Sequence, residues 1–117
     1  EGVSIIAGTD AGFLNSFDYP GQALHDEIAL YVKSGLTPLQ ALQSAVVAGP
    51  RFLGKLDRYG SIGAGKAADL LVLDADPLAD IGATRKIRMV VSRGEVHDRA
   101  RLDKMLEGVK RWVAAQR

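Results

Sequence analysis

The sequence predicts one mixed α/β domain. Three observations support this prediction: 117 residues of which 47% are apolar, helical periodicity in the first half, and strand periodicity beyond Lys55. Such a chain can bury a core, but it is too short to close an eight-unit β/α barrel, which takes roughly 200 to 250 residues. A complete barrel is therefore excluded.

The chain opens with a strand-like segment. Val3–Ala7 carries apolar side chains on both faces, which is typical of a strand inside a sheet. Gly8–Gly12 ends this segment, and a loop with Phe13, Phe17 and Tyr19 follows it. We expect the neighbours of this strand to be missing on its N-terminal side.

Two amphipathic helices come next. Apolar side chains recur at helical spacing over Gln22–Ser34, and Gly35 is placed to terminate the helix. The second helix begins with a capping box made by Thr37 and Gln40. We expect Gly49-Pro50 to end it and to open a further short helical turn.

Beyond these helices the sequence predicts a small antiparallel group of strands. Tyr59–Ile62 is a candidate strand, and Leu70–Leu73 reads as a fully buried one. Ile87–Ser92 and Glu95–His97 are expected to pair as a hairpin across Arg93-Gly94.

A final helix follows Asp98, which is placed to cap it. We expect its apolar face to pack inward. That face consists of Leu102, Met105, Leu106, Val109, Trp112 and Val113.

Charge is nearly balanced overall but uneven along the chain. The formal net charge is +1, so no global field recruits nucleic acid or an anionic membrane, and neither is expected as a partner. Residues 1–84 hold five basic and ten acidic side chains, whereas residues 85–117 hold ten basic and four acidic ones. We expect the basic tail to fold against the acidic body, with Arg101, Lys104 and their neighbours solvated or paired with acids such as Asp26 and Glu27.

Cysteine content and hydropathy exclude further classes. Without cysteine the chain forms no disulfide framework and no thiolate metal site. The sequence has neither an apolar run long enough to span a bilayer nor a charged leader at its start. We therefore expect a soluble, cytoplasmic protein.

A glycine-rich segment imitates a phosphate-binding loop. Gly60–Lys66 has the required spacing, but Ala67 stands where a hydroxyl residue holds magnesium. A predicted strand, Leu70–Leu73, follows in place of the helix that would cradle the phosphates. The segment is better interpreted as a glycine-rich bend between two strands.

Asp10 is the strongest candidate for chemistry. A carboxylate at the carboxyl end of a buried parallel strand points into the crevice where such sheets bind ligands, although a helix cap or a turn former remains an alternative. Phe13, Phe17 and Tyr19 either line a substrate pocket or pack the loop. His25 lies near a helix start as a boundary residue, beside acids that favour the helix dipole.

The chain resembles the C-terminal part of the metal-dependent amidohydrolase superfamily, in its imidazolonepropionase-like and prolidase-like branch. The order and spacing of the matching segments carry this resemblance. They are Gly8-Thr9-Asp10, Leu24-His25-Asp26-Glu27-Ile28, Gly35-Leu36-Thr37-Pro38 with Ala41-Leu42, Leu53-Gly54, Gly60-Ser61-Ile62, Gly65-Lys66-Ala67-Ala68-Asp69-Leu70, Asp76-Pro77-Leu78, and Val90-Val91 with Gly94.

The resemblance implies a division into three parts. Residues 1–54 would hold the last barrel strand and the helices after it, residues 55–98 the returning strands of a small β-sandwich, and residues 99–117 a terminal helix. It also implies that Asp10 binds a divalent metal such as zinc and shuttles a proton to the leaving amine of a small amide or dipeptide-like substrate. His25 matches a helix segment of this branch to which we attach no firm role.

Departures from the family pattern limit what this chain can do alone. The family's His-x-His pair, its bridging lysine or glutamate, and its two further histidines are absent, since both histidines of this chain follow Asp10. Zinc needs three or more protein ligands, so we expect a fragment, a truncated gene product or an engineered piece that is inactive alone and binds no metal tightly. Alternatively, the segment is a non-catalytic association module that forms a homo-oligomer through its exposed barrel-derived surfaces, by strand pairing at Val3–Ala7 or by helix exchange.

Overall fold

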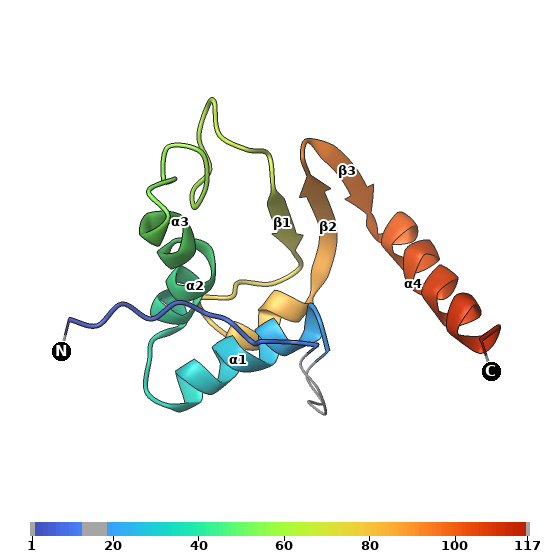
Figure 1. Ribbon diagram of the computed structural model, residues 1–117, viewed down its shortest axis with the longest axis horizontal. Helices are drawn as coiled ribbons and strands as arrows, with labels where there is room; N and C mark the ends of the chain where they lie inside the picture. Colours follow the sequence, from blue (N-terminus) through green and yellow to red (C-terminus); the bar gives the residue numbers. More distant parts are fainter. Residues whose placement is uncertain (1, 13–18, 117) are drawn as a thin grey trace.

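The computed structural model describes residues 2–12 and 19–116 and has a mixed α/β architecture. Figure 1 shows its elements in chain order. These are α1 (Gln22–Lys33), α2 (Pro38–Val46), α3 (Ala48–Phe52), β1 (Leu70–Leu73), the 3-10 helix η1 (Ile81–Arg85), β2 (Ile87–Ser92), β3 (Glu95–Asp98) and α4 (Arg99–Ala114).

The strands form one antiparallel sheet in the order β1-β2-β3. The predicted hairpin is confirmed, with Ser92 paired to Glu95 across the two-residue turn. Arg93 and Gly94 have φ values of 51° and 82° there. Positive φ at both central residues belongs to the turn type whose twist matches that of paired strands.

The small core lies where α1, α2 and η1 meet. The buried apolar residues are Ala23, Ile28, Ala41 and Ala83. Three of them are alanines, so the helices approach closely and Ile28 is the one large side chain in this group. Packing of α1 against α2 and η1 therefore depends strongly on Ile28.

The caps of the first two helices are confirmed. Gly35 follows α1 with a φ of 107°, and its N–H donates to the Val32 carbonyl at 3.0 Å. At the start of α2, the Gln40 N–H donates to Thr37 Oγ1 at 3.2 Å, and the Thr37 N–H donates to Gln40 Oε1 at 2.8 Å. This reciprocal pair is the predicted capping box.

The predicted break between the second and third helices is displaced. α2 ends at Val46 and α3 already begins at Ala48, so Gly49 and Pro50 lie inside α3 instead of separating the two helices. Proline is tolerated in the first turn of a helix because the N–H groups there have no intrahelical acceptor. The helix break therefore precedes the glycine and the proline.

The prediction of a strand at Val3–Ala7 is wrong. This segment is extended, but it pairs with none of the strands in the described residues. The Ala7 N–H instead donates to the Ser44 carbonyl at 3.1 Å, and the Gly8 N–H donates to Glu27 Oε1 at 2.9 Å. Groups of α2 and α1 thus take the amides that a neighbouring strand would otherwise bind, and Figure 1 shows the segment running across these helices.

The predicted strand at Tyr59–Ile62 is also wrong. Gly60 has a φ of 86°, a left-handed conformation that interrupts an extended backbone. A Cβ at this position would lie 3.4 Å from the Val46 carbonyl oxygen and 3.2 Å from the Leu56 side chain. The segment is therefore a tight turn packed on the end of α2.

The prediction that Leu70–Leu73 is fully buried is only half right, because β1 forms but Leu71 and Val72 are exposed. Side chains of a sheet are buried only where a second layer covers them. No described element covers these two positions.

The terminal helix forms as predicted, but its apolar face does not pack inward. Asp98 caps α4 by accepting from the Arg101 N–H at 2.8 Å. Leu106 is 57% exposed and Trp112 is 65% exposed. The reason is geometric: α4 continues directly from β3 and points away from α1, α2 and α3 (Figure 1).

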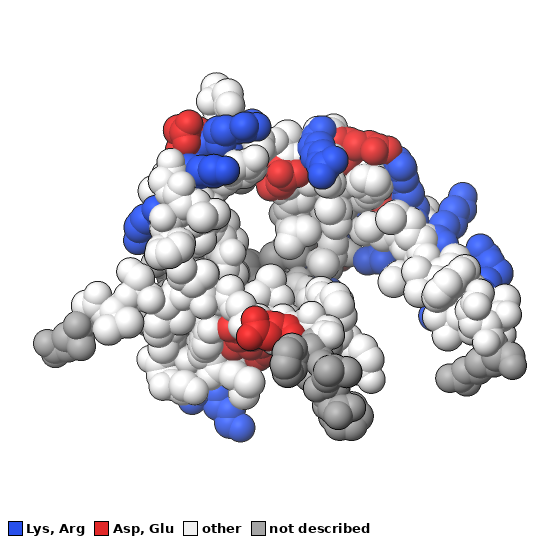
Figure 2. Space-filling view, viewed as in Figure 1, with Lys and Arg blue, Asp and Glu red and all other residues white. Residues whose placement is uncertain are grey.

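Helix α4, the last part of the basic tail, consequently does not fold against the acidic body, whereas Arg85 and Arg88 earlier in the tail pair with Asp26 and Asp74 of that body at 2.5 Å each. Within the described residues three cations of α4 have local partners, with Arg99 bound to Asp103 at 2.8 Å, Arg101 to Glu95 at 2.6 Å and Lys110 to Glu107 at 2.7 Å. Figure 2 shows lysine and arginine side chains along this projecting end of the molecule. None of the helices that the structure describes has the length and apolarity needed to cross a membrane.

Candidate functional site

The turn that ends the first extended segment presents Asp10 to solvent. Asp10 has a φ of 49°, which is uncommon for a residue with a Cβ but tolerated by aspartate and asparagine. The Ala11 N–H donates to Thr9 Oγ1 at 3.2 Å, which closes the turn. The chain therefore holds an exposed carboxylate on a constrained backbone.

The carboxylate of Glu27, on α1, anchors this turn. Glu27 Oε1 accepts the Gly8 N–H at 2.9 Å and also accepts the hydroxyl of Tyr31, one helical turn further on. The hydrogen bond to Glu27, together with burial, raises the pKa of Tyr31 to about 12. Glu27 thus joins α1 to the backbone two residues before Asp10.

The expectation that Asp26 and Glu27 favour the helix dipole is wrong. The first turn of α1 contains no acidic residue, because the helix already begins at Gln22. Asp26 Oδ1 instead binds the Arg85 guanidinium at 2.5 Å. Both acids therefore make specific contacts to other parts of the chain.

His25 connects α1 to η1. Its Nδ1 lies 3.0 Å from Thr84 Oγ1, and the Thr84 hydroxyl donates to the Ile81 carbonyl at 2.9 Å. Because that hydroxyl proton is committed, Nδ1 is the donor in this arrangement. Burial, and then the nearby Arg85 charge, lower the pKa of His25. The neutral imidazole fits a structural link at the boundary of the core.

The aromatic residues expected near the site are only partly described. Phe13 and Phe17 lie outside the described residues, whereas Tyr19 is exposed just before α1. The described structure therefore brings Asp10, Glu27 and Tyr31 into one region, while Tyr19 contributes no enclosed pocket wall.

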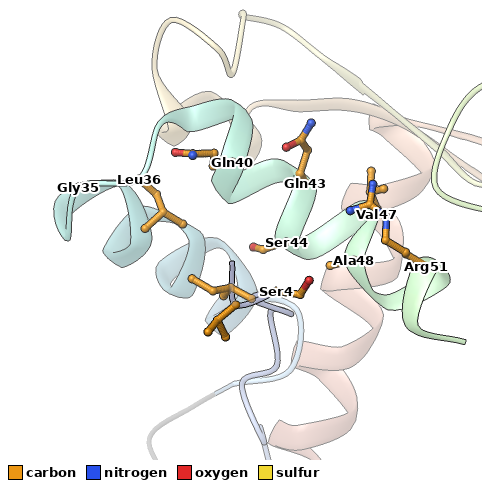
Figure 3. Close-up of a pocket in the computed structure, with 11 residues that line it drawn as sticks. Ser4, Gly35, Leu36, Gln40, Gln43, Ser44, Val47, Ala48 and Arg51 are labelled. Atoms are coloured by element: carbon orange, nitrogen blue, oxygen red, sulfur yellow. The ribbon is translucent and has the colours of Figure 1, made fainter. Parts of the chain in front are cut away.

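A groove that the sequence did not predict lies between the extended residues 3–5 and the helices α2 and α3 (Figure 3). Its volume is about 430 Å³, and Ser4, Gln40, Gln43 and Arg51 supply polar lining. Asp10 is not among its lining residues. The groove is thus separate from the candidate site.

The loop that imitates a phosphate site uses its lysine internally. The Lys66 ammonium donates to the Leu56 carbonyl and to Ser61 Oγ, the latter at 2.8 Å. These bonds close the glycine-rich segment on itself. They fit the predicted bend, although no strand precedes it within residues 2–12 and 19–59.

Comparison with known proteins identifies the family. The model of the amidohydrolase family matches residues 1–97, which is most of the chain. This chain belongs to the amidohydrolase family. The resemblance drawn from its sequence is therefore confirmed. A search of curated proteins found no match.

Solved structures of amidohydrolase-type enzymes are similar to this family member. A Xaa-Pro dipeptidase with bound methionine in the active site is 31% identical with a TM-score of 0.70, over 83% of this chain and 23% of that one. Molinate hydrolase is 34% identical with a TM-score of 0.65, over 68% and 17%. Phenylurea hydrolase B is 38% identical with a TM-score of 0.63, over 68% and 17%. The chain thus spans less than a quarter of the length of each.

Family membership raises the question of a metal. Among residues 2–12 and 19–116, no three His, Cys, Asp or Glu side chains are grouped so as to hold a metal ion. Asp10 offers one carboxylate, and the Nδ1 atom of His25 is bonded to Thr84. Since a zinc site takes at least three protein ligands, this part of the amidohydrolase fold does not fit a complete metal centre.

Proposed function

We propose that this chain is the part of a carbon–nitrogen bond hydrolase that supplies the catalytic carboxylate Asp10. The exposed position of Asp10 on an anchored turn, within a segment matching the amidohydrolase family, carries the proposal. In hydrolysis, Asp10 accepts a proton from the attacking water and returns it to the leaving nitrogen as the C–O bond forms and the C–N bond breaks. The carboxylate is regenerated at the end of the cycle.

The rest of the site belongs to the part of the fold that this chain does not span. We propose that residues 1–54 are the last barrel strand with its helices, where Val3–Ala7 would pair only in the complete barrel. Residues 55–98 would be sandwich strands, and residues 99–117 a terminal amphipathic helix. The substrate class is a small amide or dipeptide-like molecule, with Tyr19 toward the substrate side. Of the ligands of a divalent ion such as zinc, this chain supplies Asp10 alone.

Segment exchange tests the proposal. Residues 1–97 replace the matching segment of the Xaa-Pro dipeptidase, and hydrolysis of an Xaa-Pro dipeptide is measured beside the host enzyme lacking that segment. We expect activity from the hybrid and none from the truncated host. The isolated chain, incubated with zinc or manganese and a panel of dipeptides and cyclic amides, should show no turnover above its Asp10→Asn variant.

Circular dichroism and size-exclusion chromatography establish that the hybrid folds. An inactive hybrid with the host's secondary structure would contradict the proposal, as would turnover by the isolated chain above the Asp10→Asn background.

A second candidate function is association with another copy of the chain. The segment Val3–Ala7 is extended, and its apolar side chains are exposed, reaching 84% for Val3. An extended apolar edge tends to recruit a further strand. We propose that two copies pair through this segment, with the isolated chain acting as a non-catalytic module.

Light scattering distinguishes this second function. A dimer at tens of micromolar protein is expected, and Ile5→Lys should shift it toward monomer because a charge would lie in the paired edge. Leu39→Lys, a similar change at an exposed position of α2, serves as the control. A monomer at these concentrations would exclude pairing.

A further inference from the structure

Two successive amides fix the backbone that leads into Asp10. Ala7 donates to the Ser44 carbonyl at 3.1 Å, and Gly8 donates to Glu27 Oε1 at 2.9 Å. Ser44 lies in the last turn of α2, where carbonyl groups lack intrahelical donors, so the first bond also satisfies a helix end. The acceptor of the second bond is a side chain, so a substitution at Glu27 can remove this bond.

Glu27 is held in place for this bond. The Tyr31 hydroxyl, four residues along the same helix face, donates to the same Oε1 atom. The other oxygen, Oε2, is shielded from solvent and has no hydrogen-bond partner in the part of the chain that the structure describes. A single oxygen thus carries both contacts, which limits the positions that the carboxylate can adopt.

Hydrogen bonds to an ionised carboxylate are stronger than those between neutral groups. The bond from Gly8 acts two residues before Asp10, which itself has a left-handed backbone conformation. The Ala11 bond to Thr9 Oγ1 constrains the other side of the turn. Glu27 is consequently the side chain that ties the catalytic turn to α1.

We propose that Glu27 is a positioning residue: its carboxylate, oriented by Tyr31, fixes the Gly8–Asp10 turn so that the Asp10 side chain faces the reacting atoms. The inference rests on the proposed function of Asp10. Glu27 itself does not touch substrate, and its action passes through the Gly8 amide.

Two substitutions separate the hydrogen bond from the shape of the side chain. Glu27→Gln keeps a carbonyl oxygen at the Oε1 position, so it retains both acceptor contacts. Glu27→Met has a similar length and no such acceptor. Tyr31→Phe removes only the contact that orients the carboxylate.

Amide hydrogen exchange of the full 117-residue chain, followed by NMR, gives the first readout. We expect Glu27→Met to speed exchange of the Gly8 amide roughly tenfold or more, the effect of losing one hydrogen bond to a charged group. Amides in the middle of α1 should be unchanged. Glu27→Gln should preserve the protection of Gly8, and Tyr31→Phe should give an intermediate rate. Equal exchange of Gly8 in all variants would overturn the anchor.

The hybrid dipeptidase gives the second readout. Glu27→Met should lower kcat at least tenfold with KM nearly unchanged, because a displaced Asp10 affects the chemical step more than ground-state binding, and Glu27→Gln should restore most of kcat. An unchanged kcat together with faster Gly8 exchange would show that Glu27 is only structural and would overturn this inference. Failure of the proposed function is distinguishable, since Asp10→Asn would then leave kcat unchanged.

Discussion

Replacing Asp10 with asparagine in the active hybrid is expected to lower kcat by about 100- to 10,000-fold, the contribution that a positioned acid or base makes to catalysis. An amide side chain has the shape of the carboxylate but cannot accept the proton of the attacking water. The turn should survive, because asparagine also tolerates the left-handed conformation that Asp10 adopts. Loss of activity would therefore report chemistry and not backbone strain.

Asp57→Asn provides the matched control for this prediction. Asp57 is also an exposed aspartate, and it lies in a turn beyond α3. It makes no contact with the Gly8–Gly12 turn among the described hydrogen bonds. Steady-state kinetics on the Xaa-Pro dipeptide should show near-normal kcat for Asp57→Asn. Equal activity of both variants would remove Asp10 from the mechanism.

Local signals in the sequence predict most of the helices and the hairpin. The capping box at Thr37, the terminator Gly35 and the turn Arg93-Gly94 each act within a few residues, and the structure has all three as expected. Such signals work because a capped end or a paired turn satisfies backbone groups locally. Their outcome depends little on the rest of the fold.

Predictions that depend on distant partners fail in this chain. The apolar pattern of Val3–Ala7 and the apolar face around Trp112 indicate burial, but neither pattern specifies what covers it. In the described structure the amides at the end of the first segment bind acceptors on α1 and α2. The apolar face around Trp112 remains exposed on α4. Periodicity thus reports a tendency to be buried, whereas burial itself requires a second layer.

In the candidate site, too, local features were predictable from the sequence and contacts between distant residues were not. The place of Asp10 after an apolar segment makes it the sequence's candidate, and the residues that match the family model include it. The contacts of Glu27 were not predicted, because an acid near the start of a helix is usually explained by the dipole. The tyrosine four residues later was the available signal, since Glu27 and Tyr31 share one helix face. The contact to Gly8 spans 19 positions and has no local signature.

Truncation of the core residue Ile28 to alanine is expected to lower the free energy of unfolding by about 2–5 kcal/mol. Ile28 is 3% exposed, and its buried apolar neighbours in the core are alanines, which are too small to fill the space it would leave. The same helix carries Glu27 and His25, so loosening of α1 would also release the Asp10 turn and the link to Thr84. Stability and site geometry should therefore be lost together.

Leu30→Ala is the matched control, because it removes a side chain of the same size from the same helix at a position that is 58% exposed. Urea unfolding followed by circular dichroism should show a change of less than about 0.5 kcal/mol for Leu30→Ala. If Ile28→Ala is too unstable to measure, Ile28→Val should still cost about 0.5–1.5 kcal/mol. Equal losses at positions 28 and 30 would mean that α1 does not bury this face, and the anchor that Glu27 provides would then lack its rigid support.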